Sequence, residues 1–146
     1  MAILNKTKRP YLVDDENNIF IGLDLPIRKG TAGDGYFAST KTTIEAVKNN
    51  IISLLMTETG ERLFQPTLGL NLKKYMFQNY SKDLEDEIKQ SIIQKFKFWL
   101  PFVDVTGLVI GMNRVDAIGK NQIDIRCNFI INKDPNTTES VSVSIK

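Results

Sequence analysis

Two glutamates, Glu58 and Glu61, flank Gly60 and are the residues whose type and spacing can support hydrolytic chemistry. Two carboxylates about 5–10 Å apart can cleave a glycosidic bond, one as the general acid and the other as the nucleophile or base. The competing interpretation is structural: Glu58 lies on the exposed last turn of a helix, and Glu61 forms an ion pair with Arg62 or a lysine. We favour this interpretation and predict no catalytic residues. A peptidoglycan-cleaving glycosidase that uses Glu58 and Glu61 is the alternative.

The composition excludes most other catalytic and metal-binding chemistry. The chain has no histidine and a single cysteine, Cys127. It therefore has no Ser-His-Asp or Cys-His site, no histidine or thiolate cage for zinc, and no internal disulfide. Its glycines do not match a phosphate-binding fingerprint. We expect no metal, no other cofactor and no small-molecule substrate.

Charge and hydropathy narrow the choice of partners. The 19 basic and 17 acidic residues give a net charge of +2, which is too balanced for broad binding to nucleic acid or anionic lipid. No stretch approaches the roughly 18 apolar residues of a membrane span, and the first residues do not resemble a signal peptide. We therefore expect a protein of an aqueous compartment that binds neither nucleic acid nor membrane.

A helix is predicted to begin at Thr42, because Thr42 and Glu45 have the spacing of a capping box. An apolar stripe at helical spacing follows, with Asn49 and Asn50 on the opposite side. Gly60 is predicted to end this helix, since glycine accepts the left-handed backbone of a helix C-terminus. The stripe consists of Ile44, Val47, Ile51, Leu54 and Leu55.

The segment after Gly60 decides how the glutamates are interpreted. Arg62 carries five donors in a rigid fork, which suits either fixing the shape of the loop or reaching a partner. Leu63, Phe64 and Pro66 are predicted to hold this turn against the core. On this interpretation the segment is a structural clasp and not an active-site loop.

Two further helices are predicted, a short one within residues 70–79 and a long one capped by Ser81 and ended by Pro101. The apolar stripe of the long helix steps by four, four, four and three residues. It consists of Leu84, Ile88, Ile92, Phe96 and Trp99.

The period then changes from helical to alternating, which predicts strands at residues 103–112, 122–131 and 140–146. Turns are predicted at residues 117–122 and 132–139. In the middle strand, one face is apolar. It consists of Ile123, Ile125, Cys127, Phe129 and Ile131. The predicted fold is α+β, with two or three helices followed by a three-stranded antiparallel meander.

The chain is expected to divide into an N-terminal arm at residues 1–38 and a single α+β domain at residues 39–146. Residues 18–26 alternate in polarity, which fits a short strand ending at Pro26 or an arm lying on a partner. The arm is favoured because no hairpin mate is evident nearby.

The last strand is predicted to lie at an open edge of the sheet. Val141, Val143 and Ile145 alternate with serines there. An edge strand leaves backbone amides and carbonyls unpaired, and these can accept a strand from another molecule.

Residues 39–77, "STKTTIEAVKNNIISLLMTETGERLFQPTLGLNLKKYMF", resemble the baseplate wedge, or sheath-initiator, family of contractile tails. That family has a helix, then Gly-x-Arg, an aromatic residue, proline, a second glycine and a later aromatic residue. The resemblance extends to about residue 131. The matching positions are Gly60, Arg62, Phe64, Pro66, Gly69 and Phe77.

The resemblance implies a non-enzymatic virion subunit in the tail baseplate, synthesised in the bacterial host cytoplasm. Some members of the family are called lysozymes, but the residues of this chain give no support for hydrolysis. The implied role is to dock on other wedge proteins and to start sheath assembly along the inner tail tube, in six copies. The sheet edge would offer the first template for strands of the sheath subunit.

Two positions depart from the family pattern. Leu68 replaces an aromatic residue, and Leu100 and Phe102 replace the charged pair of a Glu-Pro-Arg motif that docks on the wedge core, although Pro101 is kept. Any dock here is therefore expected to be more apolar. The candidate partner-binding residues are Glu61, Arg62, Phe64, Gln65, Pro101, Phe102, Val141, Val143 and Ile145.

Overall fold

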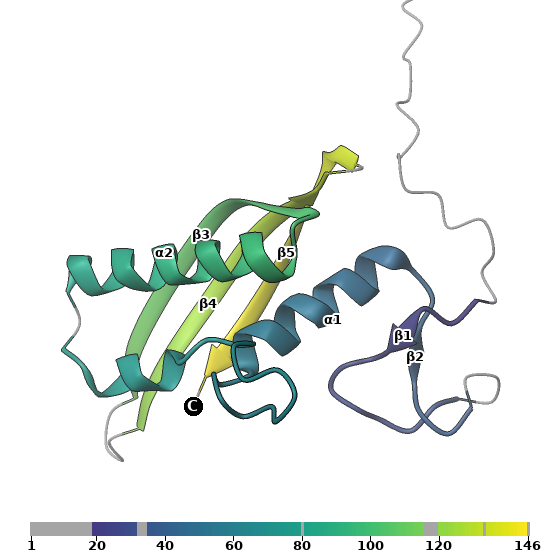
Figure 1. The fold of residues 1–146 in the computed structure, drawn as a ribbon, viewed down its shortest axis with the longest axis horizontal. Coiled ribbons are helices and arrows are strands. Elements are labelled where there is room, and N and C mark those ends of the chain that lie inside the picture. The colour runs from purple at the N-terminus through teal and green to yellow at the C-terminus, as the bar shows by residue number, and fades with distance from the viewer. Residues whose placement is uncertain (1–18, 32–34, 80, 116–119, 133, 146) are drawn as a thin grey trace, which may run out of the picture.

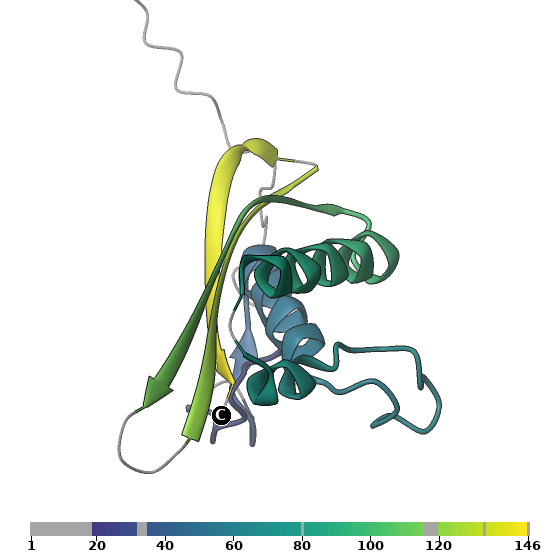
Figure 2. The same cartoon turned by 90° about the vertical axis from the view of Figure 1, so that its left-hand side faces the viewer.

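The computed structural model describes residues 19–31, 35–79, 81–115, 120–132 and 134–145. Two α-helices and a 3-10 helix lie on one face of a three-stranded antiparallel sheet (Figures 1 and 2). The predicted α+β class, with helices first and a meander last, is confirmed.

Helix α1, Thr43–Met56, begins where the sequence predicts. The Thr42 side chain accepts a hydrogen bond from the Glu45 backbone amide at 3.3 Å. The helix ends four residues before Gly60, so the prediction that Gly60 ends it is wrong. Thr57 takes an extended conformation, and its amide and hydroxyl both donate to the Ser53 carbonyl, at 3.0 and 2.6 Å. These bonds satisfy the helix terminus without a glycine.

The 3-10 helix η1, Leu72–Phe77, lies within the predicted short helix. Helix α2, Lys82–Trp99, follows, and its first turn is capped by the Ser81 side chain, which accepts from the Leu84 amide at 3.2 Å. Its stripe is buried as predicted, with Trp99 half-buried at its end. None of the described helices is long and apolar enough to span a membrane.

The sheet consists of β3 (Val103–Val115), β4 (Lys120–Ile131) and β5 (Asp134–Ile145), with β4 in the middle. The apolar face of β4 is the centre of the core. The second predicted turn is shorter than expected, because β5 already begins at Asp134 opposite Ile131. In the first predicted turn, residues 117–119 lie outside the described ranges, and residues 120–122 belong to β4 instead.

Cys127 lies on this apolar face and is fully buried, as expected of a small apolar side chain. Burial raises the pKa of its thiol to about 11. The thiolate, which is the reactive form, is therefore scarce at neutral pH.

The described residues before α1 include a small two-stranded sheet. Strand β1, Gly22–Leu23, pairs antiparallel with β2, Ser39–Thr40, which supplies the mate that the sequence did not reveal. The two strands are brought together by the glycine-bearing stretch between them, where the Gly30 amide donates to the Tyr36 carbonyl at 3.0 Å. We call residues 19–31 and 35–40 the clip.

The clip is attached to α1 by Asn49, which was expected on the outer side of the helix. Asn49 is instead 9% exposed. Its side-chain amide donates to the Leu23 carbonyl at 3.1 Å. A buried amide requires such a partner, because an unpaired polar group is costly to remove from water.

Candidate interaction sites

The loop between α1 and η1 is closed at its neck by hydrogen bonds. The Leu70 amide donates to the Thr57 carbonyl at 2.9 Å. The Thr59 amide donates to the Asn71 side chain and the Thr59 hydroxyl donates to the Gly69 carbonyl, each at 3.1 Å. These bonds fix both ends of the loop to each other.

The tip of this loop projects away from the sheet on the helical side (Figure 2). A hydrogen bond from the Gly60 amide to the Pro66 carbonyl, at 2.8 Å, joins the two sides of the loop at the base of this tip. Leu63 and Phe64 are 91% and 96% exposed. The prediction that they pack in the core with Pro66 is therefore wrong, and the loop holds two large apolar side chains in solvent.

Arg62 does not brace the turn through its side chain. Among the described residues, its guanidinium forms no hydrogen bond or ion pair, and it lies beside a small hollow of about 180 Å³ that is also lined by Leu68 and Trp99. The turn is held by main-chain bonds instead, including those from the Gln65 amide to the Arg62 carbonyl and from the Leu68 amide to the Gln65 carbonyl. The side chains of Arg62 and Gln65 are therefore exposed for contact.

The two candidate catalytic glutamates are engaged in structure. The Glu58 carboxylate pairs with the Lys73 amine at 2.7 Å. A carboxylate oxygen of Glu61 accepts from the Glu58 backbone amide at 3.0 Å. The hydrogen bond and then the charge of Glu58 raise the pKa of Lys73. Neither carboxylate lies in the grooves lined by β5, and both interactions stabilise the neck of the loop.

The segment that follows α2 forms a second exposed site. Pro101 is exposed and Phe102 is 40% exposed. Their backbone is fixed by Asn132, whose amide donates to the Phe102 carbonyl at 3.0 Å and whose side chain donates to the Pro101 carbonyl at 3.3 Å. Of the two residues that replace the expected charged pair, Phe102 is thus held partly exposed, whereas Leu100 is buried.

The third site is the free edge of β5. Its apolar side chains Val141, Val143 and Ile145 are 6%, 6% and 7% exposed, so they belong to the core. Among the described residues, no main-chain hydrogen bond joins β5 to any segment except β4. Every second residue of such a strand directs its amide and carbonyl away from the sheet. A partner would therefore bind the backbone of these residues.

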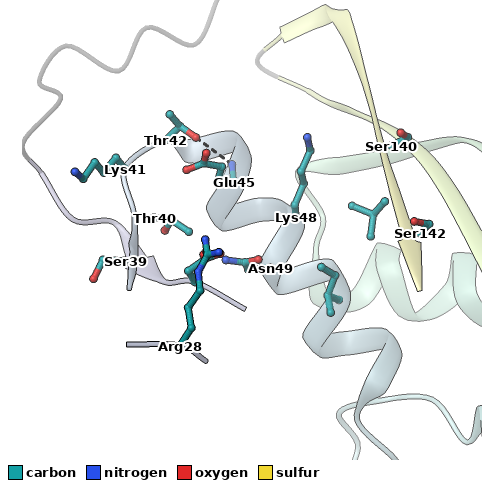
Figure 3. Close-up of a pocket in the computed structure, with 13 residues that line it drawn as sticks. Arg28, Ser39, Thr40, Lys41, Thr42, Glu45, Lys48, Asn49, Ser140 and Ser142 are labelled. Carbon is teal, nitrogen blue, oxygen red and sulfur yellow. Dashed lines mark hydrogen bonds and ion pairs between the residues drawn. The ribbon is translucent and has the colours of Figure 1, made fainter. Parts of the chain in front are cut away.

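A groove of about 540 Å³ runs along this edge. Figure 3 shows α1 between its two walls, with Ser39 and Thr40 of β2 on one side and Ser140 and Ser142 of β5 on the other. A strand added to β5 would lie over α1 and beside the clip.

The outer surface of the clip is unusually apolar, and the sequence showed this only as the alternation around residues 18–26. Large side chains with at least 44% exposure collect there. They are Ile19, Phe20, Ile21, Leu23, Ile27, Tyr36 and Phe37. Exposed apolar groups gathered in this way mark interaction surfaces more often than isolated ones do.

Among the described residues, no group of three or more acidic or cysteine side chains is placed to hold a metal ion. Residues 41–136 match the model of the baseplate wedge protein gp25 family. The chain belongs to this family. The resemblance stated from the sequence is thereby confirmed.

Relatives and solved structures agree with this membership. The baseplate wedge protein gp25 of Enterobacteria phage T4 is 19% identical over 102 residues, which cover 70% of this chain and 74% of the relative. A protein in the baseplate of the anti-feeding prophage has a similar fold, with a TM-score of 0.61 and 20% identity over 78% of this chain and 86% of that one.

Two other structures share the fold at lower identity. A proposed tail lysozyme from Geobacter sulfurreducens has a TM-score of 0.59 and 16% identity, covering 73% of this chain and 92% of its own. A chain of the postcontracted pyocin R2 baseplate has a TM-score of 0.51 and 13% identity, covering 72% and 97%. At identities this low, the likeness establishes a common fold alone.

Proposed function

We propose that the chain is a non-enzymatic structural subunit of a contractile-tail baseplate, and that it starts sheath assembly by accepting a strand on β5. The observation that carries the proposal is the unpaired edge of β5 beside a groove. Strand addition supplies main-chain hydrogen bonds, each with a modest net contribution of about 1 kcal/mol. Six copies on one ring would multiply these weak contacts into a strong template.

An electron-microscopy map of the assembled baseplate tests this use of the edge directly. The expected result is density for a foreign segment paired with β5, running between β5 and the clip. A map in which the edge stays unpaired in the sheathed particle would contradict the proposal.

Docking on other wedge proteins is assigned to the loop tip and to the segment after α2. Leu63 and Phe64 carry large apolar surface on a fixed loop, and Pro101 and Phe102 do so on a second fixed segment. A wedge partner with an apolar pocket would bury these side chains, and Glu61, Arg62 and Gln65 would form the polar rim of the contact.

We predict that Leu63→Ser with Phe64→Ser abolishes incorporation into the baseplate and leaves the fold unchanged. The two side chains already lie in water, so the free energy of unfolding should change by less than about 0.5 kcal/mol. Buried in a partner, they would each contribute about 2 kcal/mol or more. Urea unfolding of the purified chain and quantification of the chain in purified tails measure the two effects.

The matched control is Phe98→Ser, another largely exposed aromatic change, at a position outside both proposed docking segments. It should be incorporated normally. Normal incorporation of the Leu63→Ser, Phe64→Ser variant would exclude the loop tip as a docking site.

The glycosidase alternative is tested by a separate assay. A cell-wall-cleaving enzyme must clear a peptidoglycan suspension and must lose this activity as Glu58→Gln or Glu61→Gln. The present geometry favours the structural role, because one carboxylate is paired with Lys73 and the other is bonded to the loop backbone. Clearing by the native chain that either substitution removes would overturn this conclusion.

A further inference from the structure

The free edge of β5 presents a problem for the isolated subunit. An unpaired edge strand rich in β-branched residues is a template for the same strand of another copy, and two such edges can pair across a two-fold axis. A subunit that waits for a partner strand needs a feature that opposes this self-pairing. The clip stands on the far side of the groove from the edge (Figure 3).

We infer that the clip, anchored on α1 by Asn49, guards the β5 edge against pairing with a second copy while leaving room for one extended segment of a partner protein. The inference deepens the proposed function, since it concerns the same edge. It adds a role for residues 19–31 and 35–40 and states the shape of partner that the edge accepts.

Two buried polar side chains hold β1 in place, Asn49 from α1 and Thr40 from β2 within the clip. Asn49 donates to the Leu23 carbonyl at 3.1 Å, and Thr40 donates its hydroxyl hydrogen to the Gly22 carbonyl at 3.2 Å. Thr40 is 2% exposed and Asn49 is 9% exposed. The rest of the buried surface of α1 is apolar. Asn49 is thus the buried position of α1 that carries a polar side chain in place of an apolar one, and this side chain holds β1.

The walls of the groove determine which shapes of partner can reach the edge of β5. A single extended segment brings no structure on its far side, so it can lie between β5 and the clip. The edge of a second folded copy brings its own α1 and its own clip, and a groove of about 540 Å³ cannot receive them. With the clip in place, edge-to-edge pairing is blocked and strand insertion is not.

The lining also limits the chemistry of the inserted segment. Arg28 is paired with Asp24, and Lys48 is paired with Glu139 of β5 at 2.8 Å. Lys41 and Glu45 add one charge of each sign to the lining, so the groove favours neither a basic nor an acidic segment. Side chains directed toward α1 would meet Ile52, beside Val141. The fitting partner is an extended segment without a large net charge.

The experiment uses a reporter on the edge, Ser142→Cys. Ser142 is exposed on β5, whereas the natural Cys127 is fully buried and will not react in the folded chain. Disulfide-linked dimer is measured after mild oxidation in three versions of the full chain: the reporter alone, the reporter with Asn49→Ala, and the reporter with Asn50→Ala. Asn50 is the exposed neighbour on the same helix and is the matched control.

The reporter alone and the Asn50→Ala version should stay monomeric. The Asn49→Ala version should form about tenfold more dimer, as expected when a hydrogen bond worth about 1 kcal/mol or slightly more no longer holds the clip. Limited proteolysis at Arg28 should increase in parallel. A further Ser142→Lys version of Asn49→Ala, followed by sedimentation, should return to the monomer because like charges meet across the pair.

Thr40→Val loosens β1 from β2 inside the clip and leaves α1 unaltered, so it is a second release variant that does not depend on the folding of Asn49→Ala. Dimer formation by the reporter alone would overturn the inference. Increased cleavage at Arg28 without increased dimer, in either release variant, would also overturn it. Neither result bears on whether a sheath strand binds β5, which the map of the baseplate decides separately.

Discussion

Replacing Gly69 by alanine should destabilise the protein by roughly 3 kcal/mol or more, because the backbone at this position is both left-handed and crowded. Gly69 has a φ of +97°, and an added Cβ would lie 2.2 Å from the Thr57 carbonyl oxygen. That carbonyl accepts the hydrogen bond from Leu70 that closes the neck of the loop. The change should appear as a large fall in the urea midpoint with a similar slope.

Gly60→Ala is the matched control for Gly69→Ala. Gly60 also has a left-handed backbone, with a φ of +92°, but no atom lies within 4 Å of an added Cβ. Only the conformational preference is lost, which amounts to about 1 kcal/mol. Equal destabilisation by the two substitutions would show that the close approach at Thr57 does not hold the loop, and that backbone conformation alone accounts for both.

The contrast between these glycines shows where sequence reasoning succeeded and where it failed. Periodicity and capping identified both α-helices and the meander, because those signals lie within a few residues of one another. The start of α1 at Thr42 is an example. The role of Gly69 depends on Thr57, 12 residues earlier in the chain, and no local pattern reports that contact.

The prediction for the loop tip was wrong for a related reason. Leu63 and Phe64 look like core residues because they are large and apolar, and a sequence does not show whether a surface exists for them to pack against. In the structure the neck of the loop is closed by main-chain and side-chain hydrogen bonds, and its tip is held away from the helices. The same residues became a stronger candidate for partner binding once they were found exposed.

The clip is the largest feature that the sequence did not predict. Its two strands are separated by a stretch of glycine and polar residues, and each pairs over only two residues. Such short pairing leaves almost no alternating pattern to detect. Asn49 was equally ambiguous, because asparagine is usually exposed on a helix and only its bond to Leu23 explains its burial.

A strand joined covalently to the free edge of β5 should raise stability and abolish sheath initiation. The variant carries an Asn-Gly turn after Lys146, followed by alternating threonine and valine, so that the added strand folds back antiparallel to β5. Cross-strand pairs contribute about 0.2–1 kcal/mol each, and the free energy of unfolding should therefore rise by about 1–3 kcal/mol. Truncating β5 is a poorer test, because Val141, Val143 and Ile145 are part of the core.

The control carries an extension of equal length with proline at alternate positions, which cannot pair with an edge. It should leave stability and sheath formation unchanged. The two variants are compared by urea unfolding, by amide hydrogen exchange on β5 and by counting sheathed tails in electron micrographs. If exchange shows the added strand seated on β5 and sheaths still form at the normal number, the edge cannot be the template. Loss of sheaths with the pairing strand alone would assign initiation to the backbone of β5, because the proline extension has the same length but leaves that backbone unpaired.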